Sequence, residues 1–301
     1  MIRICGKETV VEGKLIRIAH LDGEGYQFLD DPKGAVAAIR SSGSRIDLFT
    51  FIQKVSDTTP RYGYPMEWDN MAVLPVSTLD HWMTNQIDFK VRNKVRKAAK
   101  NGVVVREVPF DDVLVRGVSV IYNESPIRQG KPFWHYGKDL EAVRRMNATF
   151  MSQSIFIGAF FDGILIGFVK LVANEESSQA GLMQIISMIQ HRDKAPTNAL
   201  IAQAVKSCAD RGIPHLWYAN FLYGKKHPDS LADFKRHNGF RKVDIPRYYV
   251  PLTATGEVAY RLGLHRNARQ WVPEPVAAAY RWARAVWCSR MSLGTKSACH
   301  E

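Results

Sequence analysis

The chain has 301 residues, of which 46% are hydrophobic and 23% are charged. This composition is ordinary for a folded globular protein and excludes an intrinsically disordered chain. The 41 lysines and arginines outnumber the 29 aspartates and glutamates, which gives a formal net charge of +12. An anionic partner is therefore expected, such as a nucleotide-like cofactor, RNA or an acidic membrane surface.

The four cysteines are scattered along the sequence, at positions 5, 208, 288 and 299. Without paired spacing they indicate neither a metal site nor a disulfide framework, and reduced thiols are expected. No apolar run approaches the ~18 residues of a spanning helix, and no signal-peptide segment precedes Arg3 and Lys7. These features favour a cytoplasmic protein that binds no metal.

Residues 1–80 are expected to form a small α/β unit. A helix candidate at 31–43 ends at Gly43, which suits a helix C-terminus. The β-like runs of this unit lie at 9–13, 14–21, 45–53 and 71–76.

A basic helix is predicted from Leu79 to Gly102. Its apolar residues recur at helical spacing, so that one side packs while the rest is cationic. The charge run is either a solvated face with cations near a helix C-terminus, or a surface that binds the phosphates of a substrate or RNA. The cations in its last part are Lys90, Arg92, Lys94, Arg96, Lys97 and Lys100.

The segment 127–139 is dense in aromatic and polar side chains and joins two predicted helices. A loop of this composition is more often a binding surface than a simple connection. Arg128, Trp134 and Tyr136 are therefore expected to bind substrate. His135 is a candidate general base, although a structural hydrogen bond is the more common role of a single histidine.

A β-α-β unit is predicted from 181 to 221, after a hairpin centred on Asp162-Gly163. Its first strand leads into the polar elbow HRDKAPTN and then into a helix that begins near Pro196. Backbone N–H groups at such a helix start can hold an anion. The residues expected to bind an anionic donor at this elbow are Ile189, Gln190, Arg192, Lys194, Thr197, Asn198 and Ala199.

The chain ends with RKVDIPRYYVPL, predicted to be a closing strand pair or ribbon, and a tail from Thr253. The tail contains an amphipathic helix candidate, WVPEPVAAAYRWARAVWCSRM. Its apolar face either packs on the body of the protein or makes a peripheral contact with an anionic membrane.

The order of elements from residue 103 onward is β, α, loop, α, β-hairpin, β, elbow, α, β, α, β. This order resembles the fold of the GCN5-related N-acetyltransferases (GNAT) and of the FemAB-type aminoacyltransferases. The resemblance implies an α/β, GNAT-like fold with a mixed, mostly antiparallel sheet flanked by helices. It implies a small N-terminal unit (1–80), an acyltransferase domain (81–252) and a helical basic C-terminal tail (253–301).

Two motifs make the resemblance more specific. The elbow QHRDKAPTNAL stands where the acetyltransferases have a glycine-rich pyrophosphate loop, and it lacks those glycines. In SLADFKRHNGF, Lys235 stands where the acetyltransferases often have a proton-donating tyrosine. FemAB-type enzymes are similar in having Phe-Lys before a glycine-rich turn, and a basic helix that ends in Lys-Asn-Gly, as here at 100–102.

The resemblance implies that Lys235 stabilises the oxyanion or the leaving group electrostatically and that Arg236 lies at the substrate. His135, Asp193 and Tyr218 are candidates for the general base, and substrate-assisted or water-mediated proton transfer is an alternative.

The function implied first is transfer of an acyl group from acyl-CoA (acetyl-CoA) to an amine acceptor, a small molecule or peptide. One alternative is an aminoacyl-tRNA-dependent transferase that acts on a cell-wall precursor or another amine. A second is a non-catalytic basic module that binds RNA or lipid on a decayed transferase fold.

Overall fold

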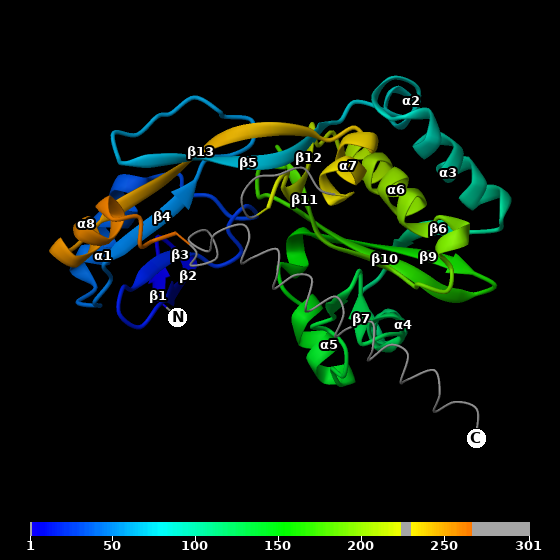
Figure 1. Ribbon diagram of the computed structural model, residues 1–301, viewed down its shortest axis with the longest axis horizontal. Coiled ribbons are helices and arrows are strands. Elements are labelled where there is room, and N and C mark those ends of the chain that lie inside the picture. Colours follow the sequence, from blue (N-terminus) through cyan, green and yellow to red (C-terminus); the bar gives the residue numbers. More distant parts are fainter. Residues whose placement is uncertain (1, 224–229, 267–301) are drawn as a thin grey trace.

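The computed structural model describes residues 2–223 and 230–266. Within these residues, a single eleven-stranded sheet runs through the molecule, with helices on both faces (Figure 1). The strand order is β1-β2-β3-β4-β13-β5-β12-β11-β10-β9-β6. Neighbouring strands are antiparallel except for the β3–β4 and β11–β12 pairs. This is the mixed, mostly antiparallel sheet that the sequence predicts. The strands are Ile2–Ile4 (β1), Lys7–Glu12 (β2), Ile18–Leu21 (β3), Leu48–Ile52 (β4), Met66–Pro75 (β5), Val104–Val108 (β6), Ser154–Phe161 (β9), Ile164–Ala173 (β10), Ala180–Ser187 (β11), His215–Asn220 (β12) and Arg241–Pro251 (β13), and a separate small ribbon pairs Ile127–Arg128 (β7) with Lys131–Pro132 (β8).

β13 lies between β4 and β5, although it comes almost 170 residues after them. It is one continuous strand of 11 residues, antiparallel to both neighbours. The prediction of a strand pair or ribbon here was wrong, because both edges of the segment are occupied by strands from the start of the chain. The sheet is therefore continuous across residue 80, and the three-part division of the chain stays a prediction.

The two faces of the β6–β12 part of the sheet carry different helices. α3, α6 and α7 lie on one face, and α4 and α5 lie on the other (Figure 1). A Cβ on Gly167 would lie 2.9 Å from Leu200 of α6, and a Cβ on Gly117 of α4 would lie 2.7 Å from Leu165. On both faces, a larger residue at the glycine would force the facing leucine side chain to shift. The helices are Pro32–Ser41 (α1), Leu79–His81 (α2), Phe89–Lys100 (α3), Asp112–Asn123 (α4), Leu140–Asn147 (α5), Pro196–Asp210 (α6), Ser230–His237 (α7) and Ala254–Arg261 (α8).

The helix predicted over 79–102 is interrupted. α2 runs into the π-helical turn Trp82–Gln86, and α3 then begins after Asp88, whose carboxylate accepts a hydrogen bond from Lys90 N at 2.8 Å. The indole of the buried Trp82 donates to Asn238 O at 3.0 Å, at the end of α7. This tertiary contact takes precedence over helix continuity, because helix propensity is only a weak local preference.

The remaining elements from β6 to β13 follow the predicted order, except that the segment 127–139, predicted to be a loop, contains the short ribbon of β7 and β8. At the turn between β9 and β10, Asp162 and Gly163 both have positive φ, at 48° and 77°, as a two-residue hairpin turn with right-handed strand twist requires. The amphipathic helix candidate in the tail lies outside the described residues. No helix among the described residues has both the length and the apolar character needed to cross a bilayer.

The largest cluster of buried apolar side chains lies between the β6–β12 part of the sheet and its covering helices. It includes Phe168 in the sheet, Leu200 on α6 and Tyr122 on α4, each fully buried. A second cluster surrounds Phe49 and Tyr248 beneath α1. The elbow between β11 and α6 is therefore anchored at both ends in the largest core.

Candidate functional site

The strands β11 and β12 are hydrogen-bonded over only a short length. β11 pairs with β10 from Ala180 to Ser187, but it pairs with β12 only at Ala180 and Gly181. The β10–β11 ladder also shifts register beside Met183, as at a β-bulge. Beyond Gly181, the β12-side edge of β11 is therefore not part of a ladder.

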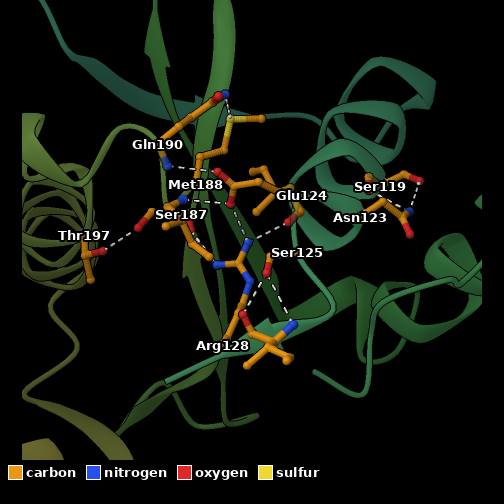
Figure 2. Close-up of polar contacts among 12 residues, drawn as sticks. Ser119, Asn123, Glu124, Ser125, Arg128, Ser187, Met188, Gln190 and Thr197 are labelled. Carbon is orange, nitrogen blue, oxygen red and sulfur yellow. Dashed lines mark hydrogen bonds and ion pairs between the residues drawn. The ribbon is translucent and has the colours of Figure 1, made fainter. Parts of the chain in front are cut away.

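The elbow after β11 is closed by a carboxylate from the chain itself (Figure 2). Glu124, just after α4, accepts hydrogen bonds from the backbone N–H groups of Ile189 at 2.7 Å and Gln190 at 2.9 Å. The same carboxylate pairs with Arg128 at 2.9 Å, and both side chains are largely buried, with 15% and 12% of their surface exposed. The first two amides of the predicted donor site are thus already bound to an anion.

Arg128 has a structural role in this arrangement, because its guanidinium is bound by groups of the chain itself. Besides Glu124, its guanidinium donates to Ser187 O at 2.8 Å and to Ile121 O at 2.7 Å, and it lies over the ring of Phe133. Burial lowers the pKa of Arg128, an effect that Glu124 opposes. Glu124 and Arg128 together join α4 to the end of β11. We call these two residues the elbow clamp.

The rest of the elbow is held by local hydrogen bonds. A 3-10 turn at Arg192–Lys194 ends at Ala195, which has a φ of 54°. The amides of Asn198 and Ala199 donate to Ala195 O at 3.2 and 3.4 Å, and the Thr197 hydroxyl lies 2.8 Å from that of Ser187.

The two cations of the elbow differ in their surroundings. Lys194 pairs with the exposed Asp193 at 3.2 Å and lies over the ring of Phe161. Arg192 is exposed. Arg192 is thus the more exposed of the two cations, and most of the elbow's amides have partners within the chain.

Lys235 is fully buried on α7. Its ammonium donates to Asn220 O at 2.5 Å, at the end of β12, and lies 4.6 Å and 4.9 Å from the ring centres of Tyr218 and Tyr223. The structure thus brings together two predicted catalytic residues, Lys235 and Tyr218. Burial raises the pKa of Tyr218 to about 12, with a smaller contribution from the nearby Tyr223, so its phenol is protonated at neutral pH. A protonated phenol donates a proton rather than accepting one.

α7 ends beside the start of α6. Asn198 Nδ2 lies 3.4 Å from Asn238 Oδ1, a contact between the elbow helix and the turn after α7. Lys235 and the elbow are therefore parts of one region at the ends of β11 and β12. Arg236, the predicted substrate ligand beside Lys235, is exposed and pairs with Asp233 at 2.6 Å.

His135 belongs to the other face of the sheet. Its ring packs on Tyr122 of α4, with 4.4 Å between ring centres, and its Nε2 lies 3.5 Å from Gln184 Nε2 of β11. Burial lowers the pKa of His135, and the charges of Lys138 and Arg128 lower it further, so the ring is neutral at neutral pH. Trp134 and Tyr136 beside it are exposed, and Lys138 lies over the Trp134 ring. His135 and Lys235 thus approach β11 and β12 from opposite faces.

The basic helix α3 lies next to α6 and to the 3-10 turn of the elbow. Arg92 donates to the carbonyls of Met83 and Thr84 and so ends the preceding π-helical turn. The other cations are exposed and have no ion-pair partner among the residues that the structure describes. We call these five the α3 cations: Lys90, Lys94, Arg96, Lys97 and Lys100.

Sequence analysis did not identify Glu124 as a site residue. Its amide partners are 65 and 66 residues away, and the only local signal was the spacing of four residues to Arg128. Within 2–223 and 230–266, no cluster of His, Cys, Asp and Glu side chains is suited to hold a metal ion.

Comparison with known proteins found similarity in structure. No family model matches the sequence, and no curated protein matches it either. The structure is similar to FemX, with a TM-score of 0.61, 12% identity, and coverage of 85% of this chain and 86% of FemX. It is also similar to the C-terminal domain of an Agrobacterium fabrum protein named as a lysylphosphatidylglycerol synthetase (TM-score 0.52, 12% identity, 84% and 83% coverage) and to L-PGS from Bacillus licheniformis (0.52, 12%, 86% and 87%). The chain therefore has the GNAT/FemAB-like fold that its order of elements predicts.

Proposed function

We propose that the chain is an aminoacyltransferase that takes an aminoacyl group from aminoacyl-tRNA and passes it to an amine or to a lipid hydroxyl group. The observation that carries this proposal is the elbow clamp, because Glu124 occupies the amides of Ile189 and Gln190. A coenzyme A pyrophosphate at the same place would meet a buried carboxylate, and like charges at short distance repel. Aminoacyl-tRNA, whose phosphates can bind away from these amides, is therefore favoured over acyl-CoA as the donor.

The α3 cations supply the place for those phosphates. They are exposed, have no ion-pair partner among the described residues, and lie on a helix that packs against α6. Polyanionic RNA gains most from such a surface, because each neutralised phosphate releases condensed counterions. The basic helix thus has a role in binding the donor rather than only in solvation.

Lys235 is proposed to act on the reacting carbonyl. In the reaction, the acceptor atom, an amine nitrogen or the hydroxyl oxygen of a lipid, attacks the ester carbonyl of the donor, the bond to the tRNA ribose oxygen breaks, and a proton passes from the acceptor atom to that oxygen. Lys235 stabilises the negative charge that develops on the carbonyl oxygen, and the protonated Tyr218 beside it is placed to donate to the leaving oxygen.

The general base is the group that takes the proton from the attacking acceptor. Asp193 is a weak base because its hydrogen bond to Lys194 lowers the pKa of its carboxyl. His135 is neutral at neutral pH and so is able to accept a proton. The name of the lysylphosphatidylglycerol synthetases states an aminoacylated lipid as product, so a lipid acceptor belongs in the test beside soluble amines.

The test combines a transfer assay with a binding measurement. The full chain is mixed with tRNA charged with labelled amino acids and with amine or phosphatidylglycerol acceptors, and titration calorimetry measures binding of acetyl-CoA. We expect transfer of label and no heat with acetyl-CoA. Lys235→Met is expected to lower kcat about 100-fold or more, whereas Lys242→Met, which removes a cation from an exposed ion pair, leaves kcat unchanged.

Two outcomes would overturn the proposal. Micromolar binding of acetyl-CoA without transfer from charged tRNA would indicate an acyl-CoA-dependent acyltransferase instead. Binding of tRNA without transfer to any acceptor would favour the non-catalytic RNA-binding module.

A further inference from the structure

A row of polar groups joins the N-terminal part of the sheet to Lys235. Glu24 accepts a hydrogen bond from Arg247 at 2.7 Å, and Arg247 also donates to Asp69 at 3.1 Å. Asp69 accepts from the side-chain amide of Asn220 at 2.8 Å. The backbone oxygen of Asn220 is the acceptor of the Lys235 ammonium. Residues from the two ends of the described chain, Glu24 and Asp69 on one side and Asn220, Lys235 and Arg247 on the other, thus meet in one row.

The backbone that carries this oxygen is held in an unusual conformation. Ala219 has a φ of 47°, and the ladder between β12 and β5 shifts register at this point. Asn70 of β5 fixes the next two residues, because its backbone oxygen accepts from Phe221 N at 3.2 Å and its side-chain oxygen from Leu222 N at 2.6 Å. A left-handed alanine persists only where the surrounding structure enforces it. β5 therefore sets the direction of the Asn220 carbonyl.

The charges along the row favour a cation at its end. Glu24 and Asp69 contribute two carboxylates and Arg247 one guanidinium, a sum of one negative charge. Burial alone would lower the pKa of Arg247, but the two carboxylates raise it above its ordinary value, so the guanidinium stays charged. The row therefore carries a net negative charge, and the Lys235 ammonium lies at its end on the Asn220 carbonyl.

We infer that Asp69 is a positioning residue for Lys235. With Arg247 and Asn220 it fixes the carbonyl on which the ammonium rests, and so the N-terminal part of the sheet contributes to the site in the second half of the chain. The catalytic consequence rests on the proposed function, because it requires Lys235 to act in transfer. The positioning itself is a property of the folded chain and is measurable without substrate.

Chemical labelling of lysines tests the positioning. Lys235 and Lys170 are 0% and 1% exposed, but Lys170 lies on β10, outside the row, and serves as an internal reference. The full-length chain is treated with an amine-acylating reagent, and mass spectrometry measures the rate at each lysine. We expect Asp69→Ala to raise the Lys235 rate about tenfold, the effect of losing one hydrogen bond to a charged group, with the Lys170 rate unchanged.

Matched variants separate this effect from general loosening. Asp244→Ala removes a carboxylate from an exposed pair on the same strand as Arg247 and is expected to change neither rate. Asn220→Ala should act like Asp69→Ala, and the double variant should label no faster than either single one, because both remove the same link. If Asp69→Ala does not fold, the isosteric Asp69→Asn is used, with a several-fold rise expected at Lys235 alone.

The results also separate this inference from the proposed function. A Lys235 rate unchanged by Asp69→Ala, or an equal rise at Lys170, overturns the positioning role even if the native chain transfers aminoacyl groups. Selective labelling of Lys235 in a chain that shows no transfer leaves the positioning role intact and refutes the proposed reaction. In an active chain, Asp69→Ala should lower kcat and leave the KM for tRNA unchanged.

Discussion

The carboxylate of Glu124 and the guanidinium of Arg128, four residues apart, form a largely buried ion pair with 2.9 Å between oxygen and nitrogen. The pair spans the short connection after α4 and holds the start of the elbow through Ile189, Gln190 and Ser187. It therefore fixes the geometry of a loop that in the resembling acetyltransferases receives a ligand.

Removing one partner of this pair should be costly. Glu124→Ala is expected to lower the free energy of unfolding by about 2–4 kcal/mol, because it leaves a buried guanidinium and two amides without their acceptor. Urea denaturation measures the change. Glu141→Ala, which removes a carboxylate from exposed pairs, should cost less than about 0.5 kcal/mol. Equal losses in the two variants would contradict a structural role for the clamp.

The α3 cations should control RNA binding through salt. The triple variant Lys94→Ala, Arg96→Ala, Lys97→Ala is expected to weaken tRNA binding and to reduce the slope of log K against log salt by about 2–3, close to 0.9 per lost phosphate contact. Fluorescence anisotropy at several salt concentrations gives the slope. The matched control removes Lys206, Lys242 and Arg261, which have the same total charge but are paired with carboxylates. A similar slope change in both triple variants would mean that net charge alone binds RNA.

His135 should titrate below its ordinary range. Burial lowers the pKa of its ring, and the nearby Lys138 lowers it further. We expect an NMR midpoint below 6.5, which moves upward in Lys138→Ala and stays in place in Lys131→Ala, a change in the same loop. The signal is assigned by its loss in His135→Gln. A midpoint at 6.5 or above in the native chain would remove the basis for a neutral His135.

Lys170 should make stability depend on pH in the alkaline range. Burial lowers the pKa of its amine to about 8, although its ammonium donates to Asn147 O at 2.9 Å and Thr149 Oγ1 at 2.8 Å. Between pH 8 and 10.5 the unfolded chain therefore holds a proton that the folded chain has lost. Stability should therefore rise with pH across this window. Below the window, Lys170 is protonated in both the folded and the unfolded chain, and the unfavourable contribution of its buried ammonium has its full size.

The variant Lys170→Met isolates this contribution. The free energy of unfolding of the native chain, relative to Lys170→Met, should increase by up to about 3 kcal/mol between pH 8 and 10.5. Lys206→Met, which changes an exposed lysine, should show no such trend. A difference from Lys170→Met that does not change with pH would show that Asn147 O, Thr149 O and Thr149 Oγ1 offset the burial of the ammonium.

Most elements from β6 to α7 could be predicted because they carry local signals. Asp111 and Asp139 accept hydrogen bonds from the first turns of α4 and α5, as capping residues do, and Asp162-Gly163 forms the hairpin turn. Signals of this kind depend on residues within a few positions of each other. The order of elements, and with it the fold, follows from them.

Features that depend on distant contacts were not predictable in this way. The apolar spacing continues through Asp88, and only the packing of Trp82 against the turn after α7 shows why the helix stops there. The position of β13 depends on pairing with β4 and β5, which end more than 160 residues earlier in the chain. Glu124 gave no signal because its backbone partners are defined by the fold and not by their side chains.

The insertion of β13 between β4 and β5 also sets an order for assembly during synthesis. Until residue 251 has left the ribosome, β4 and β5 lack the neighbour that joins them, and their facing edges have open backbone groups. Such edges can pair with other chains. The N-terminal part of the sheet therefore stays incompletely folded until β13 has been synthesised, and a nascent chain stalled after α7 should be a target for chaperones.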